Sequence, residues 1–128
     1  QQNGATPLLI ASEKGHPEIV QLLLEVGAAV NQANARGATP LYIACQEGRL
    51  ECVRLLLEAS AAVNQAAAGG FTPLFIACQM GHLECAQVLR QAGAAINQAR
   101  NNGATPLFIA CQKGHLEIVG LLLGASAA

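Results

Sequence analysis

The chain has 128 residues, of which 52% are hydrophobic, and this is enough apolar material for one domain with a continuous core. Only 12% of the residues are charged and the formal net charge is −1, so no concentration of Lys and Arg indicates nucleic acid or an acidic membrane surface as a partner. No apolar stretch approaches the roughly 18 residues that would suggest a membrane span.

The tripeptide Thr-Pro-Leu recurs at an unvarying step of 33 residues, beginning at Thr6, Thr39, Thr72 and Thr105. A fixed period of this size is typical of a stacked array of repeats. We therefore expect a single domain, residues 1–128, made of four repeats that cover about residues 1–33, 34–66, 67–99 and 100–128. Because each unit of such an array contacts only its neighbours, a long surface stays open, and recognition is a more natural function than catalysis.

The same elements are predicted in the same order in every repeat. A short Gly-containing turn comes first, followed by a helix whose start is marked by Thr and Pro and whose end is marked by Gly, as at Thr105, Pro106 and Gly114. A second helix follows at once, because apolar residues recur at helical spacing from Leu116. Its first turn carries a carboxylate in each repeat, at Glu18, Glu51, Glu84 and Glu117, where a negative charge meets the positive end of the helix dipole.

These features resemble the ankyrin repeat family over the whole chain. The residues that carry the resemblance in the first repeat are Gly4-Ala5-Thr6-Pro7-Leu8, Gly15-His16, Leu22-Leu23-Leu24 and Val30-Asn31. The resemblance implies an all-α solenoid of helix-turn-helix units in two layers. Its projecting β-turn loops would form a cupped surface that holds a protein partner.

Several positions depart from the family pattern. Family members usually carry His directly after Thr-Pro-Leu, whereas this chain has Leu9, Tyr42, Phe75 and Phe108. The chain also contains no Asp, and since Asp accepts hydrogen bonds from nearby backbone N–H groups, we expect weaker turns. Ser60 and Ser126 replace the glycine that closes the second helix, at a cost of about 1 kcal/mol if that place needs a left-handed backbone. These departures suggest an engineered or consensus-like member of the family.

The five cysteines lie at helical places, and their odd number predicts free, buried thiols. Such thiols indicate a reducing compartment, hence the cytoplasm or the nucleus if the chain is natural. Cys78, His82 and Cys85 have a spacing that superficially resembles a metal site, but each falls at a place that the repeat register explains. We expect no metal, no cofactor and no catalytic residue, and hence no enzyme.

By the resemblance, partner contacts concentrate in the projecting turns and on the exposed side of each first helix. In the first repeat the pattern includes Gln2 and Asn3. Phe71 stands where the other repeats have Ala, so it either forms a hot spot with Met80 or folds down onto the neighbouring turn. If it is a hot spot, Phe71→Ala with Met80→Ala weakens binding without unfolding the array. The candidate partner-binding residues are Arg36, Gln46, Phe71, Gln79, Met80 and Lys113.

A second function is left open by the similarity of the repeats. Arrays normally finish with polar capping units, yet the first and last repeats of this chain resemble the internal ones. The chain could therefore be a structural or engineered scaffold without an evolved ligand. Its uncapped ends could associate head to tail into a homo-oligomer.

Overall fold

The protein is a row of four helical hairpins. The computed structural model describes the backbone of residues 4–127 and the side chains of residues 4–125. In this range the helices are α1 (Pro7–Lys14), α2 (Pro17–Glu25), α3 (Pro40–Glu47), α4 (Leu50–Glu58), α5 (Pro73–Met80), α6 (Leu83–Gln91), α7 (Pro106–Lys113) and α8 (Leu116–Ala127). The expected all-α repeat architecture is confirmed.

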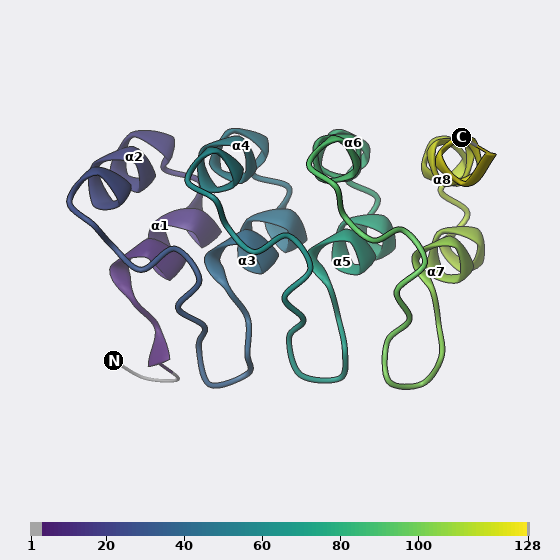
Figure 1. Cartoon of the computed structure of the whole chain (residues 1–128), viewed down its shortest axis with the longest axis horizontal. Helices are drawn as coiled ribbons and strands as arrows, with labels where there is room; N and C mark the ends of the chain where they lie inside the picture. The colour runs from purple at the N-terminus through teal and green to yellow at the C-terminus, as the bar shows by residue number, and fades with distance from the viewer. Residues whose placement is uncertain (1–3, 128) are drawn as a thin grey trace.

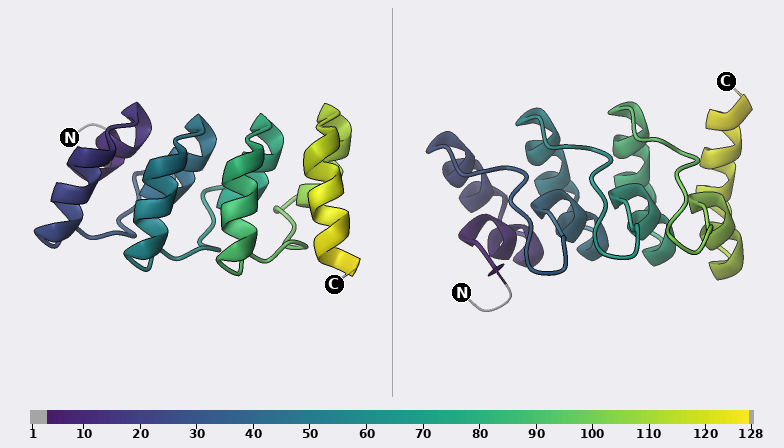
Figure 2. Two further views of the ribbon diagram at one scale, coloured as in Figure 1. Left: turned by 90° about the horizontal axis from the view of Figure 1, so that it is seen from above. Right: turned by 60° about the horizontal axis from the view of Figure 1, so that its bottom comes forward.

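The helices form two layers. The first helices of the repeats, α1, α3, α5 and α7, lie side by side, and the second helices, α2, α4, α6 and α8, form a parallel row above them (Figures 1 and 2). Each helix contacts its repeat partner and the equivalent helix of the next repeat. The loops that join successive repeats project away from the helices on the side of the first layer (Figure 1).

Each first helix begins and ends as its sequence predicts. The Thr before Pro adopts an extended backbone, and its hydroxyl accepts a hydrogen bond from the N–H three residues later, at 3.1–3.2 Å in all four repeats. Each helix ends at a glycine in the left-handed region, with φ between 71° and 80°, at Gly15, Gly48, Gly81 and Gly114. Local sequence therefore fixes both ends of the first helix.

In the second, third and fourth repeats, the residue before the second helix ties the repeat to the one before it. The ring nitrogen Nε2 of His82 lies 3.1 Å from the backbone oxygen of Gln46, and Nε2 of His115 lies 3.1 Å from that of Gln79. At the equivalent place Arg49 donates from Nε to the backbone oxygen of Glu13 at 3.0 Å. The two histidines thus bridge repeats, as expected for structural residues.

The close packing of these histidines explains two of the glycines. A Cβ atom added to Gly48 would lie 2.7 Å from a ring carbon of His82, and one added to Gly81 would lie 2.7 Å from a ring carbon of His115. Glycine is therefore required here both for the left-handed backbone and for the approach of the next repeat.

The projecting turns are hydrogen-bonded better than the lack of Asp suggests. Oδ1 of Asn34 accepts from the N–H groups of Arg36 at 2.9 Å and Ala38 at 3.1 Å, and Oδ1 of Asn102 accepts from Ala104 at 3.0 Å. An Asn amide oxygen accepts from the turn as a carboxylate does. Asparagine therefore supplies the missing acceptor in the second and fourth turns, and the expected weakening of the turns stays a prediction.

The third turn has no such acceptor, because Ala67 and Ala68 occupy its first places. Backbone groups hold it instead. The N–H of Ala67 donates to the oxygen of Phe71 at 2.8 Å, the N–H of Ala68 donates to the oxygen of Arg36 at 2.8 Å, and Gly69 accepts from Asn101 at 2.9 Å. The third turn is therefore tied to the turns on both sides.

Ser60 and Ser126 are expected to end second helices at a place that needs a left-handed backbone. Ser60, after α4, has φ 69° and is the one non-glycine residue with positive φ in the described range. The expected left-handed place is confirmed there. At Ser126 the expectation is wrong, since α8 continues through Ala127. Leu and Ala favour helix in this segment, and α8 runs past the place at which α4 ends.

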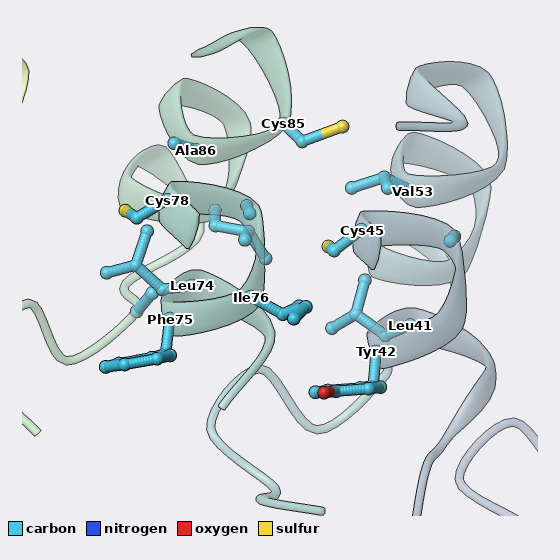
Figure 3. Packing of buried hydrophobic residues seen from close by; sticks show 14 of the residues in the cluster. Leu41, Tyr42, Cys45, Val53, Leu74, Phe75, Ile76, Cys78, Cys85 and Ala86 are labelled. Carbon is cyan, nitrogen blue, oxygen red and sulfur yellow. The ribbon is translucent and has the colours of Figure 1, made fainter. Parts of the chain in front are cut away.

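The hydrophobic core runs along the array between the two layers. Figure 3 shows the junction of the second and third repeats, where Ile76 projects from α5 towards α3 and Cys85 projects from α6 towards α4. Leu41 is almost completely buried there, and Leu74 and Phe75, which lie on the other side of α5, are almost completely buried as well. All five thiols are free, but Cys111 is exposed, so the prediction of buried thiols is wrong for that residue. Its equivalents Cys45 and Cys78 face the next repeat, and no repeat within the described residues follows Cys111.

Candidate functional site

The candidate site is the surface formed by the projecting turns (residues 34–38, 67–71 and 100–104) and the exposed sides of α1, α3, α5 and α7. We call it the cupped face. Its turns project below the first-layer helices in Figure 1, so the turns and these helices meet at an angle (Figures 1 and 2). Gln2 and Asn3, which the family pattern adds to this face, lie outside the described residues.

A groove of about 530 Å³ lies on the cupped face, at the second and third repeats. Helices α1, α3 and α5 form one wall, and the second and third turns form the other. The residues that line it are Glu13, Asn34, Arg36, Ala38, Tyr42, Ile43, Gln46, Ala67, Ala68, Phe71, Ile76, Gln79 and Met80.

Five of the six candidate residues meet at this groove: Arg36, Gln46, Phe71, Gln79 and Met80. The sixth, Lys113, lies apart, exposed in the last turn of α7. The structure thus brings together most of the residues chosen from sequence. That a partner contacts them stays a prediction.

The groove combines an apolar floor with polar edges. Ile43 and Ile76 contribute to the floor, and the side chain of Met80 is 48% exposed beside them. Gln46 and Gln79 are half-buried, while Arg36 is exposed on the second turn. An apolar surface with a few polar groups is typical of recognition sites, because burial supplies affinity and the polar groups supply orientation.

Among the groove residues that sequence reasoning missed are three from the first helices, Tyr42, Ile43 and Ile76. They belong to the apolar runs of α3 and α5, which the sequence assigns to the core. Tyr42 and Ile76 are indeed buried, but each keeps part of its side chain at the surface of the groove. A phenol in an otherwise apolar run, at Tyr42, was the available signal, since a buried Tyr usually keeps its hydroxyl near a polar surface.

Phe71 folds towards the neighbouring turn and is only partly exposed. Its ring packs edge-to-face on Phe75, with centroids 5.4 Å apart and planes at 82°. The guanidinium carbon of Arg100, from the fourth turn, lies 3.9 Å from the centre of the Phe71 ring. Of the two arrangements left open by the sequence, the structure therefore has the packed one. The Phe71→Ala change would disturb the packing of two turns as well as the groove.

Arg100 is the most unusual cation at this face. Its Nε atom is buried and has no hydrogen-bond partner among the described residues. Burial raises the pKa of the Tyr42 phenol, and the positive charge of Arg100 partly offsets this rise. The field of Arg100 therefore reaches a residue that lines the groove.

A second hollow, of about 590 Å³, lies on the opposite side of the molecule between α2 and α4. It is lined by Pro17, Glu18, Gln21, Leu22, Glu25, Glu51 and Leu55. Only one layer of helices surrounds it, and Gln21 is already hydrogen-bonded to Glu25 across its edge. The groove on the cupped face has walls from both helices and turns, so it is the stronger candidate for a binding site.

The described residues contain no group of three or more His, Cys, Asp or Glu side chains placed to hold a metal ion. Cys78 and Cys85 are buried, and burial raises their pKa values to about 12 and about 11. They are therefore neutral thiols at physiological pH, whereas thiolates are the form that binds metals and attacks substrates. Among the helices described, none is long and apolar enough to cross a membrane.

Comparison with known families agrees with the architecture. A family model described as ankyrin repeats (3 copies) matches residues 1–67 and again residues 62–128. The two matches together cover the chain. No curated protein matches it. The paired helices, the projecting turns and the family match together establish that this chain belongs to the ankyrin repeat family.

Proposed function

We propose that the cupped face binds a protein partner and that the groove at the second and third repeats is the centre of contact. Ankyrin repeats are generally protein–protein interaction modules. The observation that supports this location is the convergence of α1, α3, α5 and two turns on one groove, which is floored by Ile43 and Ile76. Gln46, Gln79, Met80 and Arg36 would contact the partner there, and Lys113 would extend the contact along the face.

Peptide selection tests this proposal without a known partner. Random 12-residue peptides displayed on phage are selected against the immobilised protein, and the enriched peptides are then measured by fluorescence polarisation. We expect Gln79→Ala with Met80→Ala to weaken binding at least about tenfold, because contacts at the centre of an interface contribute most. Gln87→Ala, an exposed glutamine on α6, is the matched control and should leave the affinity unchanged.

Both changes replace partly or fully exposed helix residues by Ala, the best helix former, so circular dichroism should show that each variant is folded. If the enriched peptides bind the double variant as tightly as the original protein, the groove is not the contact site. Catalysis is not part of the proposal, since the ankyrin family is typically non-catalytic.

A second candidate function is end-to-end association of two copies of this chain. The outer face of the first repeat exposes Ile10, Ile19 and Leu22, and that of the fourth exposes Phe108, Leu116 and Leu123. At most of the equivalent places in the middle repeats the side chain is buried or half-buried between neighbours. We propose that the last repeat of one copy covers the first repeat of another, by the same packing that joins successive repeats.

Sedimentation velocity over a wide concentration range tests this second candidate. The mass should grow with concentration for the original chain and stay that of a monomer for Phe108→Lys, which puts a charge on the outer face of the fourth repeat. Met80→Lys, on the cupped face, is the control and should associate like the original. A constant monomer mass for the original chain would rule out association through the ends.

We also propose that the protein works in a reducing compartment, the cytoplasm or the nucleus. Five free thiols support this, because oxidising compartments favour disulfides. Detection of the untagged chain by fractionation of cells that produce it would test the assignment. Recovery in the secretory compartments would contradict it.

A further inference from the structure

The charges of this nearly neutral chain are separated between its two sides. The segments that form the turns and first helices (residues 4–15, 34–48, 67–81 and 100–114) carry four basic residues, Lys14, Arg36, Arg100 and Lys113, against Glu13 and Glu47. The segments that form the second helices and their loops (16–33, 49–66, 82–99 and 115–127) carry three arginines against six glutamates. The formal charge is therefore +2 on the side of the cupped face and −3 on the other.

Two of the basic residues flank the third turn. Arg36 lies on the second turn, whose backbone oxygen accepts from Ala68 of the third, and Arg100 begins the fourth turn, whose Asn101 donates to Gly69 of the third. The third turn itself carries no charge. Arg36 and Arg100 therefore lie one turn before and one turn after the turn that carries Phe71.

Neither arginine is neutralised by the chain itself. The described residues form no ion pair with Arg36 or Arg100, and neither guanidinium donates a hydrogen bond to them. Stacking on Phe71 holds the Arg100 guanidinium in place but uses none of its N–H donors. Nε is the one buried nitrogen of this guanidinium without a partner among the described residues, so its terminal N–H groups are the donors open to a carboxylate. A guanidinium pairs best with a carboxylate through charge-assisted hydrogen bonds.

The apolar floor lies next to these cations. Ile43 and Ile76 line it, and Met80 adds a flexible, exposed side chain that adapts to different shapes. One carboxylate, Glu13, is present among the residues that line the groove. Arg36 is the one cation among those lining residues, and Arg100 lies beside them against Phe71. A basic segment would therefore lie near two guanidinium groups and a single carboxylate, which disfavours it.

We propose that the groove binds an acidic peptide segment in which carboxylates pair with Arg36 and Arg100 while a neighbouring apolar side chain contacts Ile43, Ile76 and Met80. This proposal rests on the proposed function of the cupped face. It adds the chemistry of the partner: a protein segment rich in Asp and Glu and interspersed with apolar residues.

The phage-selected 12-residue peptides also test this proposal. We expect the peptides that depend on Gln79 and Met80 to be enriched in Asp and Glu. Synthetic copies with every Glu and Asp replaced by Gln and Asn should bind at least about tenfold more weakly, because charge-assisted hydrogen bonds are lost. Raising NaCl from 50 to 500 mM should weaken the acidic peptides and leave the amide copies little changed.

Variants of the two arginines locate the effect. Arg36→Gln should weaken the acidic peptides about threefold, as expected for an exposed pair, and Arg100→Gln about tenfold, since its guanidinium is partly buried. Arg100→Lys keeps the charge but not the planar guanidinium, so its affinity should lie between those of the original protein and Arg100→Gln. It replaces Arg100→Gln as the test if that variant perturbs the turn. Arg90→Gln, an exposed arginine on α6, is the matched control and should have no effect.

The outcomes separate this inference from the proposed function. Groove-dependent peptides without acidic enrichment, or acidic peptides insensitive to both arginine changes, would overturn the inference and leave the proposed function intact. Selection that yields no peptide dependent on Gln79 and Met80 would overturn both. Acidic, groove-dependent peptides that respond to Arg36→Gln and to Arg100→Gln or Arg100→Lys, but not to Arg90→Gln, would establish it.

Discussion

The middle repeats and the outer repeats carry similar residues at equivalent places but bury them very differently. Phe75 in the third repeat is 1% exposed, whereas Phe108, one repeat later, is 56% exposed. On the opposite face of the repeat, Cys52 is 1% exposed and its equivalent Ile19 is 47% exposed. Within residues 4–127 a middle repeat has neighbours on two faces and an outer repeat has a neighbour on one. Burial in this molecule is therefore set by the neighbours of a repeat rather than by its own sequence.

Because burial differs between the repeats, Phe→Ala should destabilise the protein much more in the third repeat than in the fourth. Phe75→Ala should lower the free energy of unfolding by about 3–5 kcal/mol, because it leaves a cavity between the third and fourth repeats. Phe108→Ala should lower it by less than about 1 kcal/mol, as for an exposed side chain. Urea denaturation followed by circular dichroism measures both values.

The two phenylalanine variants are matched in helix position and in the Thr cap that precedes them, so backbone effects cancel. The measurement should be made at low protein concentration and repeated at high concentration. If both variants lost the same free energy of unfolding at low concentration, the contribution of Phe would not depend on the neighbours of its repeat. A loss for Phe108→Ala that grows with concentration would show that another copy covers this side chain.

The glycines that end α5 and α7 differ in the same way, because only the first of them has a following repeat packed against it in the described part of the chain. Gly81 and Gly114 have φ of 80° and 75°, so an alanine at either place is strained by about 1–2 kcal/mol. At Gly81 the added Cβ would also lie 2.7 Å from the His115 ring, whereas at Gly114 nothing lies within 4 Å. Gly81→Ala should therefore cost about 2–4 kcal/mol and Gly114→Ala about 1–2 kcal/mol in urea denaturation. Equal costs would mean that the His115 ring moves aside freely.

The buried thiols of the third repeat make the stability of the protein depend on pH. Burial raises the pKa of Cys78 to about 12 and that of Cys85 to about 11, from an ordinary value of 9.0. Above pH 9 the unfolded chain releases these protons and the folded chain keeps them, so stability is complete below about pH 8.5 and falls as the pH rises towards 11–12. At pH 10 each thiol should account for a loss of about 1–1.5 kcal/mol.

Denaturation midpoints at pH 7.5 and pH 10, under reducing conditions, measure this fall. Cys78→Ala with Cys85→Ala should reduce it by about 2–3 kcal/mol. Cys111→Ala is the outer-repeat control and should retain the full fall, since that side chain is exposed. If the double variant loses as much stability at pH 10 as the original chain, the buried thiols are not its source.

The parts of this structure that sequence predicts are those that one repeat determines by itself. The Thr caps, the left-handed glycines and the positions of Glu18, Glu51, Glu84 and Glu117 in the first turns of their helices follow from local residues. The period of 33 residues adds the stacking order. Asn34 could also have been foreseen as a substitute for Asp, because its amide oxygen has the same reach.

The features that sequence missed depend on the placement of a neighbour. Arg100 covers Phe71 only because the fourth turn packs on the third, and Cys111 is exposed only because its face lies beyond the last described junction. Tyr42 and Ile76 reach the groove because α3 and α5 stand side by side. Since none of these relations lies within one repeat, the repeat pattern alone does not reveal them.

Ser12 and Cys45 provide the finest form of the comparison, because they occupy the same place in the first and second repeats and both are 0% exposed. The hydroxyl of Ser12 has no hydrogen-bond partner among the described residues, and a buried polar group without a partner is destabilising. Ser12→Cys replaces the hydroxyl by a group that behaves as a small hydrophobe, and should raise the free energy of unfolding by about 1 kcal/mol. The reverse change, Cys45→Ser, should lower it by about 1–3 kcal/mol, because the middle repeat has less freedom to move towards water. If Ser12→Cys destabilises the chain in urea denaturation, a water or a backbone oxygen satisfies the hydroxyl in solution, and the first repeat is looser than the middle repeats at this place.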